Sequence, residues 1–185
     1  MLLRETVAKY EKAYKDGMFS GATISHKLVL DYVRFLRNSK KIETILDIGC
    51  GRGLLLNEFK SHECKVSGVE IVPYLLMHEL KDMNVVPGAC CDVNRIFTEY
   101  KFDLVLYVDV LDHLTNDDEA IRALRAGKCI CSGGIILTVN GGSPMQTIIK
   151  TEREWEALIN ISGVADESVV STKTDKSGTS IIGIW

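Results

Sequence analysis

The sequence predicts an α/β fold with a doubly wound, mostly parallel sheet of seven strands and helices on both faces. From residue 43 onward, short apolar runs that end in glycine or an acidic residue alternate with amphipathic helical segments. Such an alternation requires crossover connections, which place parallel strands between two layers of helices. The last two apolar runs, 167–174 and 179–185, are joined by a short turn, and a short connection makes a pair of strands antiparallel.

Two helical segments precede this alternation. Residues 2–15 and 22–37 both carry apolar side chains at helical spacing. The five strands expected before the final hairpin are residues 43–48, 65–70, 85–90, 102–108 and 135–139. With 185 residues, the chain suits a single domain, in which residues 1–40 are helical and residues 41–185 form the core.

Local capping signals predict where the helices begin and end. Pro73 suits a first helical turn, and Asn116 suits the N-cap of a helix whose first turn is acidic. Thr151 and Glu154 have the spacing of a capping box, and Gly163 marks the end of the same helix.

Glycines indicate two further boundaries. Ser132-Gly133-Gly134 is expected to break the chain between the helix that starts after Asn116 and the fifth strand. Asp175-Lys176-Ser177-Gly178 is expected to form the turn of the final hairpin.

The composition disfavours several classes of partner. The formal net charge is −3 and no dense basic tract is present, which argues against a nucleic-acid partner. No apolar run approaches the about 20 residues of a membrane span, and the first residues lack the apolar segment of a signal peptide. We therefore expect a cytoplasmic monomer or homodimer. The six cysteines lack the spacing of metal ligands, so we expect buried, reduced thiols and no metal site.

A glycine-rich turn, Asp47-Ile48-Gly49-Cys50-Gly51-Arg52-Gly53, follows the first strand. Ligands of parallel sheets bind beyond the carboxyl ends of the strands, so this turn lies at the expected ligand edge. Its glycines permit a sharp turn and a close approach of the backbone to a ligand. A dinucleotide fingerprint needs glycine at positions 1, 3 and 6, but position 6 here is Leu54. A tight turn without a ligand is the alternative.

Two acidic residues follow the next strands at the same edge. Glu70 closes the second strand, where a carboxylate can accept both hydroxyl hydrogens of a ribose; a plain surface acid is the alternative. Asp92 comes just after the third strand, where it can accept a hydrogen bond from an adenine amino group. Asp92 can also serve as the N-cap of a helix over 93–98, and the two roles are compatible.

Six short motifs occur in a fixed order between residues 43 and 165. They are Asp47–Gly53, Gly68–Glu70, Cys91–Val93, Phe102–Val105, Val110–Leu114 and Ser132–Leu137. This ordered set resembles the class I S-adenosylmethionine-dependent methyltransferases, and in particular the small-molecule branch that includes ubiquinone- and menaquinone-type enzymes. The resemblance implies a Rossmann-like fold, S-adenosyl-L-methionine as the cofactor and S-adenosyl-L-homocysteine as the product.

The resemblance also implies a cofactor site along the carboxyl ends of the strands. Its implied residues are Asp47, Gly49, Cys50, Gly51, Gly53, Glu70, Ile71, Asp92, Val93, Tyr107 and Val108. Asp47 would hold the amino group of the methionine part, and Glu70 would hold the ribose. Ile71 would pack on the adenine, and Tyr107 or Val108 would lie near the methionine arm.

Residues 1–40 would form a lid in such an enzyme. Tyr10 or Tyr14 would cover the cofactor, or would simply pack along the face of their helix. Only about ten residues separate the fifth strand from the next helix. The acceptor pocket would then be built mainly from residues 1–40 and the loops after strands four and five. This favours a modest acceptor, or a pocket completed by a partner subunit.

Methyl transfer from a sulfonium needs alignment of the reacting atoms more than it needs reactive side chains. His113, after the fourth strand, is the candidate general base, and Asp109 is a second candidate catalytic residue. The family often has a Glu-His pair where this chain has Asp112-His113. The alternative is that His113 caps or packs against the next helix. Asn140 could touch the acceptor or belong to a plain turn.

The expected activity is transfer of a methyl group to oxygen, nitrogen or carbon of a small-molecule acceptor. Two alternatives stay open: a non-catalytic S-adenosylmethionine-binding partner subunit, and an NAD(P)-dependent oxidoreductase. The glycine spacing and the lack of a Tyr-x-x-x-Lys pair argue against the oxidoreductase.

Overall fold

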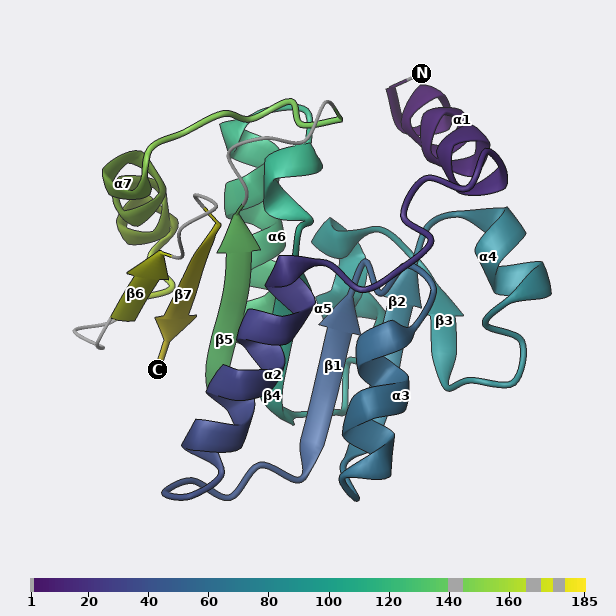
Figure 1. The fold of residues 1–185 in the computed structure, drawn as a ribbon. Coiled ribbons are helices and arrows are strands. Elements are labelled where there is room, and N and C mark those ends of the chain that lie inside the picture. The colour runs from purple at the N-terminus through teal and green to yellow at the C-terminus, as the bar shows by residue number, and fades with distance from the viewer. Residues whose placement is uncertain (1, 140–144, 166–170, 175–178) are drawn as a thin grey trace.

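The computed structural model describes residues 2–139, 145–165, 171–174 and 179–185. These residues form one seven-stranded sheet in the order β3-β2-β1-β4-β5-β7-β6 (Figure 1). Its strands are β1 (Thr44–Ile48), β2 (Lys65–Glu70), β3 (Val85–Pro87), β4 (Phe102–Val108), β5 (Cys131–Val139), β6 (Ser171–Thr174) and β7 (Ser180–Ile184). The first five strands are parallel, and β7 is antiparallel to both β5 and β6. The predicted α/β fold, with its mostly parallel sheet and antiparallel C-terminal pair, is confirmed. The predicted hairpin turn, 175–178, lies outside the described residues.

Helices cover both faces of this sheet (Figure 1). They are α1 (Leu2–Lys15), α2 (Ile24–Leu36), α3 (Leu54–Ser61), α4 (Pro73–His78), α5 (Val93–Ile96), α6 (Asp117–Cys129) and α7 (Glu152–Ser162). The alternation of β4 shows how the layers form, because successive side chains of a strand point to opposite faces. Leu104 and Leu106 enter the core beneath α2 and α3, whereas Val105 and Tyr107 enter the core beneath α6 and α7.

The two N-terminal helices have different positions. Val29, Val33 and Leu36 of α2 are buried against the sheet, so α2 belongs to one of the covering layers. In contrast, α1 lies above the carboxyl ends of the strands, beside α4 (Figure 1). Within residues 1–40, α1 and the connection after it are therefore the part that faces the expected ligand edge. A domain boundary at residue 40 stays a prediction.

The predicted capping signals are confirmed. Pro73 occupies the first turn of α4, and the side chain of Asn116 caps α6. Thr151 and Glu154 form the capping box of α7, which ends at Gly163 in the left-handed conformation with φ 68°.

Two strand boundaries differ from the prediction. The third strand, expected over 85–90, ends at Pro87, and residues 90–92 form a 3₁₀ turn; proline has no N–H with which to continue a ladder. The glycines expected to break the chain before the fifth strand instead lie inside β5. A Cβ on Gly133 would meet the Asp103 carbonyl oxygen at 2.2 Å, and a Cβ on Gly134 would meet the Trp185 ring at 2.1 Å. These glycines therefore serve close packing rather than a turn.

The cysteines are all free thiols, but they are not all buried. Cys50 and Cys64 are buried, whereas Cys129, at the end of α6, is exposed, contrary to expectation. Cys129 is the last residue of α6, and its position at the helix end leaves its side chain facing water.

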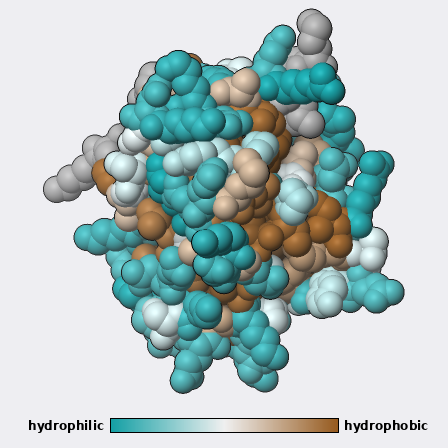
Figure 2. Space-filling view, turned by 90° about the vertical axis from the view of Figure 1, so that its right-hand side faces the viewer, coloured by the Kyte–Doolittle hydropathy of each residue, from teal (hydrophilic) through white to brown (hydrophobic). Residues whose placement is uncertain are grey.

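The face that carries α1, α4 and the edge strand β3 exposes apolar surface among its hydrophilic side chains (Figure 2). Met77 of α4 is 61% exposed. The free edge of the sheet beside it is short and contains Pro87, two features that limit pairing with another chain. None of the described helices is long and apolar enough to cross a membrane.

Candidate active site

The glycine turn forms a cradle at the carboxyl end of β1. Gly49, Gly51 and Gly53 have φ values of 72°, 53° and 72°, in the left-handed region that disfavours a Cβ. A Cβ on Gly49 would meet Val110 at 2.6 Å, and one on Gly53 would meet Met83 at 2.5 Å. Gly49 and Gly53 are therefore confined by packing. A Cβ on Gly51 would meet only the Tyr14 side chain, whose hydroxyl lies 2.8 Å from the Cβ position. Gly51 therefore faces the space beneath α1.

Glu70 lies at the end of β2, where its carboxylate is held by backbone donors. The Gly51 N–H donates to Oε2 at 2.8 Å, and the Ile71 and Val72 N–H groups donate to Oε1 at 2.7 and 2.9 Å. Burial raises the pKa of Glu70, and the three backbone hydrogen bonds counteract that shift. The predicted ribose-binding residue is thus beside the glycine turn, but in this structure its acceptors serve the backbone.

Asp47 and Glu70 form a pair of buried acids. Asp47 is 3% exposed and Glu70 is 4% exposed. Burial, with the nearby Glu70, raises the pKa of Asp47 to about 8. Among the residues that the structure describes, neither carboxyl group forms an ion pair with a lysine or arginine. Buried charges are costly unless they are compensated, so this arrangement favours a cationic ligand.

Three aromatic side chains from the N-terminal segment lie near the glycine turn, and we call the region of the glycine turn, Asp47 and Glu70 beneath α1 the crevice. The ring of Phe19 is 5.3 Å from the ring of Tyr14 and 6.5 Å from the ring of Tyr10. Burial raises the pKa of both tyrosines, and Glu70 adds to both shifts. The expectation that Tyr10 or Tyr14 faces the site agrees with this position. Phe19 was not predicted, because its place depends on a left-handed backbone, with φ 62°, that no sequence pattern marks.

His113 follows β4 in a short 3₁₀ turn and is hydrogen-bonded to Tyr10 of α1. The Tyr10 hydroxyl and His113 Nδ1 are 2.6 Å apart. The ring also bonds to the backbone of Met145, and burial lowers the pKa of His113. The tautomer of the ring sets whether Nδ1 accepts from the tyrosine or donates to it. The sequence pair Asp112-His113 does not form a close bond, since the nearest N–O distance is 3.9 Å.

Asp109 occupies the first position after β4 with φ 54°. Oδ1 accepts hydrogen bonds from Ser25 at 2.6 Å and from Thr138 at 2.9 Å, and Oδ2 accepts from Thr23 at 3.4 Å. The carboxylate thereby joins the N-terminus of α2 to β5. These bonds indicate that Asp109 holds α2 in place, and a catalytic role for it stays a prediction.

Two predicted cofactor residues, both at the end of β4, point their side chains into the cores on the two faces of the sheet. Tyr107 is fully buried beneath α6, where its hydroxyl donates to the Ala123 carbonyl at 2.5 Å. Val108 belongs to the core on the opposite face of the sheet. The alternation of β4 turns the Tyr107 side chain toward α6, so only the backbone at the end of β4 faces the expected ligand edge. That Tyr107 or Val108 lies near the methionine arm stays a prediction.

At the expected adenine end, the predicted residues differ in exposure. Val93 is fully buried in the core beneath α6, so its side chain does not line the crevice. Ile71 is half-buried, and the Asp92 carboxylate is 51% exposed, 3.5 Å from Arg95. Asp92 stands at the N-cap position of α5 but makes no capping bond with its side chain. The Cys50 side chain, within the glycine turn itself, is buried, and burial raises the pKa of its thiol.

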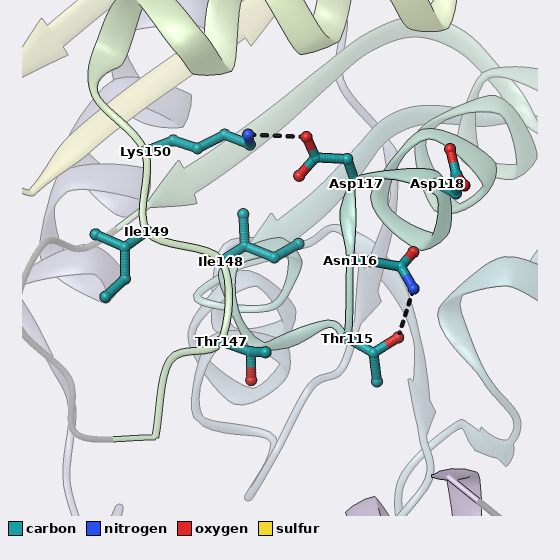
Figure 3. Close-up of a pocket in the computed structure, with 8 residues that line it drawn as sticks. All are labelled: Thr115, Asn116, Asp117, Asp118, Thr147, Ile148, Ile149 and Lys150. Carbon is teal, nitrogen blue, oxygen red and sulfur yellow. Dashed lines mark hydrogen bonds and ion pairs between the residues drawn. The ribbon is translucent and has the colours of Figure 1, made fainter.

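A hollow of about 430 Å³ lies beyond His113, between the segments 115–118 and 147–150 (Figure 3). The Lys150 amine points to the Asp117 carboxylate at 2.8 Å. None of the residues that line this hollow belongs to the glycine turn or to the acid pair Asp47 and Glu70. Asn140, a predicted acceptor contact, lies outside the described residues. In the described part of the chain, no group of three His, Cys, Asp or Glu side chains could hold a metal ion.

Comparison with known sequences places this arrangement in a family. Residues 46–138, which contain the glycine turn, both buried acids and His113, match the family described as "Methyltransferase domain". The chain belongs to this family. It is 29% identical over 92 residues to a ubiquinone biosynthesis O-methyltransferase of Rhodopseudomonas palustris, covering 45% of this chain and 36% of that protein. It is 20% identical over 175 residues to an anthranilate N-methyltransferase of Ruta graveolens, covering 94% of this chain and 46% of that protein. The chain thus spans less than half the length of these two relatives.

Solved structures confirm the fold of this methyltransferase-domain protein. An amino pentose methyltransferase from Micromonospora echinaspora, solved with S-adenosylmethionine, has a TM-score of 0.68 at 17% identity, over 95% of this chain and 96% of that one. A magnesium protoporphyrin IX methyltransferase from Synechocystis, solved with S-adenosylhomocysteine, has a TM-score of 0.65 at 15% identity, over 86% and 80% of the two chains. At these identities the likeness concerns the fold.

Proposed function

We propose that this chain is an S-adenosylmethionine-dependent methyltransferase that acts on a small-molecule acceptor and releases S-adenosylhomocysteine. The observation that carries the proposal is the buried pair Asp47 and Glu70 beside the left-handed glycine turn. Membership of the methyltransferase-domain family supports it, as do the names of the relatives and the cofactors bound in the structural neighbours.

The residues of the crevice fit this cofactor chemically. S-adenosylmethionine carries an ammonium group and a sulfonium, and two buried carboxyl groups complement such cationic groups. Glu70 could accept from ribose hydroxyls after exchanging some of its backbone donors. A Cβ on Gly51 would obstruct the open side of the cradle, where the Tyr14 hydroxyl now lies. Binding would therefore displace that hydroxyl.

When bound, the cofactor supplies a methyl group already activated on its sulfonium. The chain's own residues then have three tasks: to bind the cofactor, to align the acceptor and to exclude water. Asp47 and Glu70 contribute to binding. Tyr10, Tyr14 and Phe19 form an aromatic cover that would exclude water while α1 lies over the bound cofactor.

An acceptor hydroxyl fits the surroundings of His113. Burial lowers the pKa of this imidazole, so it is neutral and able to accept a proton at neutral pH. Its Nδ1 already shares a hydrogen bond with a phenol hydroxyl, that of Tyr10, at 2.6 Å. An incoming hydroxyl could replace Tyr10 at Nδ1, and His113 would take the proton as the methyl group is transferred. Oxygen is thus the proposed acceptor atom, ahead of nitrogen or carbon.

Calorimetry and a turnover assay test the proposal. Titration with S-adenosylmethionine, S-adenosylhomocysteine and NAD should show binding of the first two alone. Formation of S-adenosylhomocysteine with a panel of phenols and amines should identify an acceptor, and His113→Gln should reduce the rate by about 10²-fold or more. His62→Gln, on the surface beside Arg34, is the matched control. Cofactor binding without turnover would favour the non-catalytic partner subunit, and binding of NAD alone would contradict the proposal. A cytoplasmic location and a monomeric or homodimeric state remain parts of the proposal.

A further inference from the structure

Arg52 links the glycine turn to the segment that covers it. Its Nε donates to the Phe19 carbonyl at 3.1 Å, and its Nη2 donates to the Tyr14 carbonyl at 3.0 Å. Its Nη1 forms an ion pair with the Glu79 carboxylate, at the end of α4. We call this group of contacts the Arg52 clasp. The clasp joins the cofactor cradle, the end of α1, the connection after α1, and α4.

The clasp is partly protected from water, which distinguishes it from the other charged contacts of α1. The side chains of Arg52 and Glu79 are 20% and 25% exposed. In contrast, the pair Lys12–Asp16 lies on the surface, and such pairs contribute little. A guanidinium that serves two carbonyls and a carboxylate uses its fork of donors in a geometry that a lysine cannot reproduce.

Few other contacts hold α1 in place. Of residues 4–15, the part of α1 whose side chains the structure describes, Ala13 alone is buried. Lys9 donates to the Met145 carbonyl at 3.2 Å from an exposed position. Tyr10 and Tyr14 pack on the core beneath α4, and the Lys15 amine lies 5.4 Å from the centre of the Tyr74 ring of α4. With so little buried surface, the position of α1 on the rest of the protein depends strongly on each specific contact.

The clasp also places the aromatic cover over the cradle. The Arg52 guanidinium lies 5.4 Å from the centre of the Tyr14 ring, within the range of a cation–π contact. The hydroxyl of the same tyrosine lies over Gly51, in the space that a ligand in the cradle would need. A ligand therefore cannot enter while the clasp and Tyr14 keep these positions.

We propose that Arg52 is a positioning residue that holds α1 closed over the crevice through the Tyr14 and Phe19 carbonyls and Glu79, so that the clasp controls entry and release of the adenosyl ligand. The identity of the ligand rests on the proposed function, whereas the closing of α1 does not. Opening the clasp frees the Tyr14 hydroxyl to leave Gly51. Because Arg52 bonds the backbone carbonyl of Tyr14 and not its hydroxyl, the clasp can re-form over the ligand once the Tyr14 side chain has left that space. Arg52 acts on the lid and not on the reacting atoms.

Hydrogen exchange of the ligand-free protein tests the closing of α1 directly. Arg52→Met should raise exchange of the amides of residues 5–19 by roughly tenfold, the effect expected when hydrogen bonds to a charged group are lost. The exchange rate of Arg52→Lys should lie between those of the parent protein and Arg52→Met. Glu79→Gln should raise exchange by less than Arg52→Met does. The matched control is Arg125→Met, because Arg125 also donates to two carbonyls, Ser162 and Ile161, but joins α6 to α7. That control should leave exchange of residues 5–19 unchanged.

Dissociation of labelled S-adenosylhomocysteine, chased with unlabelled ligand, tests the control of release. Arg52→Met should accelerate dissociation by roughly tenfold, with partial rescue in Arg52→Lys and no change in Arg125→Met. Unchanged exchange in residues 5–19, or unchanged dissociation despite faster exchange, would overturn the proposal. If the parent protein binds no adenosyl ligand, the proposed function fails, and the exchange experiment still decides whether Arg52 closes α1.

Discussion

Substitution of Gly51 separates the cost of its backbone conformation from the cost of blocking a ligand. Gly51→Ala places a Cβ at φ 53°, on the side of the cradle that meets only the Tyr14 hydroxyl. Gly163→Ala is the matched control, because Gly163 has φ 68° and a Cβ there meets nothing within 4 Å. A left-handed conformation costs a non-glycine residue about 1–2 kcal/mol. Both variants should therefore lose similar stability.

The two variants should differ in ligand binding. In a chain of this size, about 1–2 kcal/mol corresponds to a fall in melting temperature of roughly 2–8 °C, measured by calorimetry. A methyl group forced into an occupied cradle costs about 1–3 kcal/mol more, or roughly a 5- to 150-fold loss of affinity for S-adenosylmethionine in Gly51→Ala. Gly163→Ala should bind with the parent's affinity. Equal affinities in the two variants would refute the placement of the ligand against Gly51.

Three further substitutions test individual acids. Glu70→Ala should weaken binding of S-adenosylmethionine by about 1–3 kcal/mol in calorimetry, because a charge-assisted acceptor is lost; unchanged affinity would remove Glu70 from the site. The pKa of Asp47 is about 8 in the folded state and about 3.9 in the unfolded state. Between these two pH values the folded state binds more protons than the unfolded state. The stability of the ligand-free protein therefore falls as pH rises through this window. Asp47→Asn should flatten that fall in thermal unfolding between pH 5 and 9, and an unchanged slope would show that another group causes it. Asp109→Asn should lower the free energy of unfolding by about 1–2 kcal/mol while the methyl-transfer rate stays within about tenfold; a 10²-fold slower rate at unchanged stability would instead assign Asp109 to catalysis.

The elements whose signals are local were predictable from the sequence. The glycine turn and the acid that closes β2 depend on residue types at short spacing, and the structure places both at the carboxyl ends of adjacent strands. The same holds for the caps at Asn116 and Thr151, because a capping side chain bonds to backbone three residues away.

Features that depend on distant contacts were not predictable. Tyr107 lies in a strand that is apolar on both faces, so the sequence does not show which side chains point to which helix layer. Gly133 and Gly134 were interpreted as a break, because glycine serves both turns and close packing, and only the positions of Asp103 and Trp185 distinguish the two.

The lid contacts were also missed for a physical reason. Arg52 donates to the carbonyls of Tyr14 and Phe19, and every residue has a carbonyl, so no side-chain pattern marks these partners. The one available signal was the placement of a charged residue between two glycines of the turn, where its long side chain can reach neighbouring segments. The left-handed conformation of Asp109 has no such signal.

The hydroxyl contacts of Asp109 have a consequence for the evolution and engineering of this chain. They tie α2 to β5, so we expect α2 to be held more firmly than α1, which lies above the carboxyl ends of the strands. Residues that share a contact are coupled, and the Tyr10–His113 bond joins α1 to the segment after β4. In the proposed enzyme, a substitution at His113 should therefore alter the position of α1 as well as the choice of acceptor.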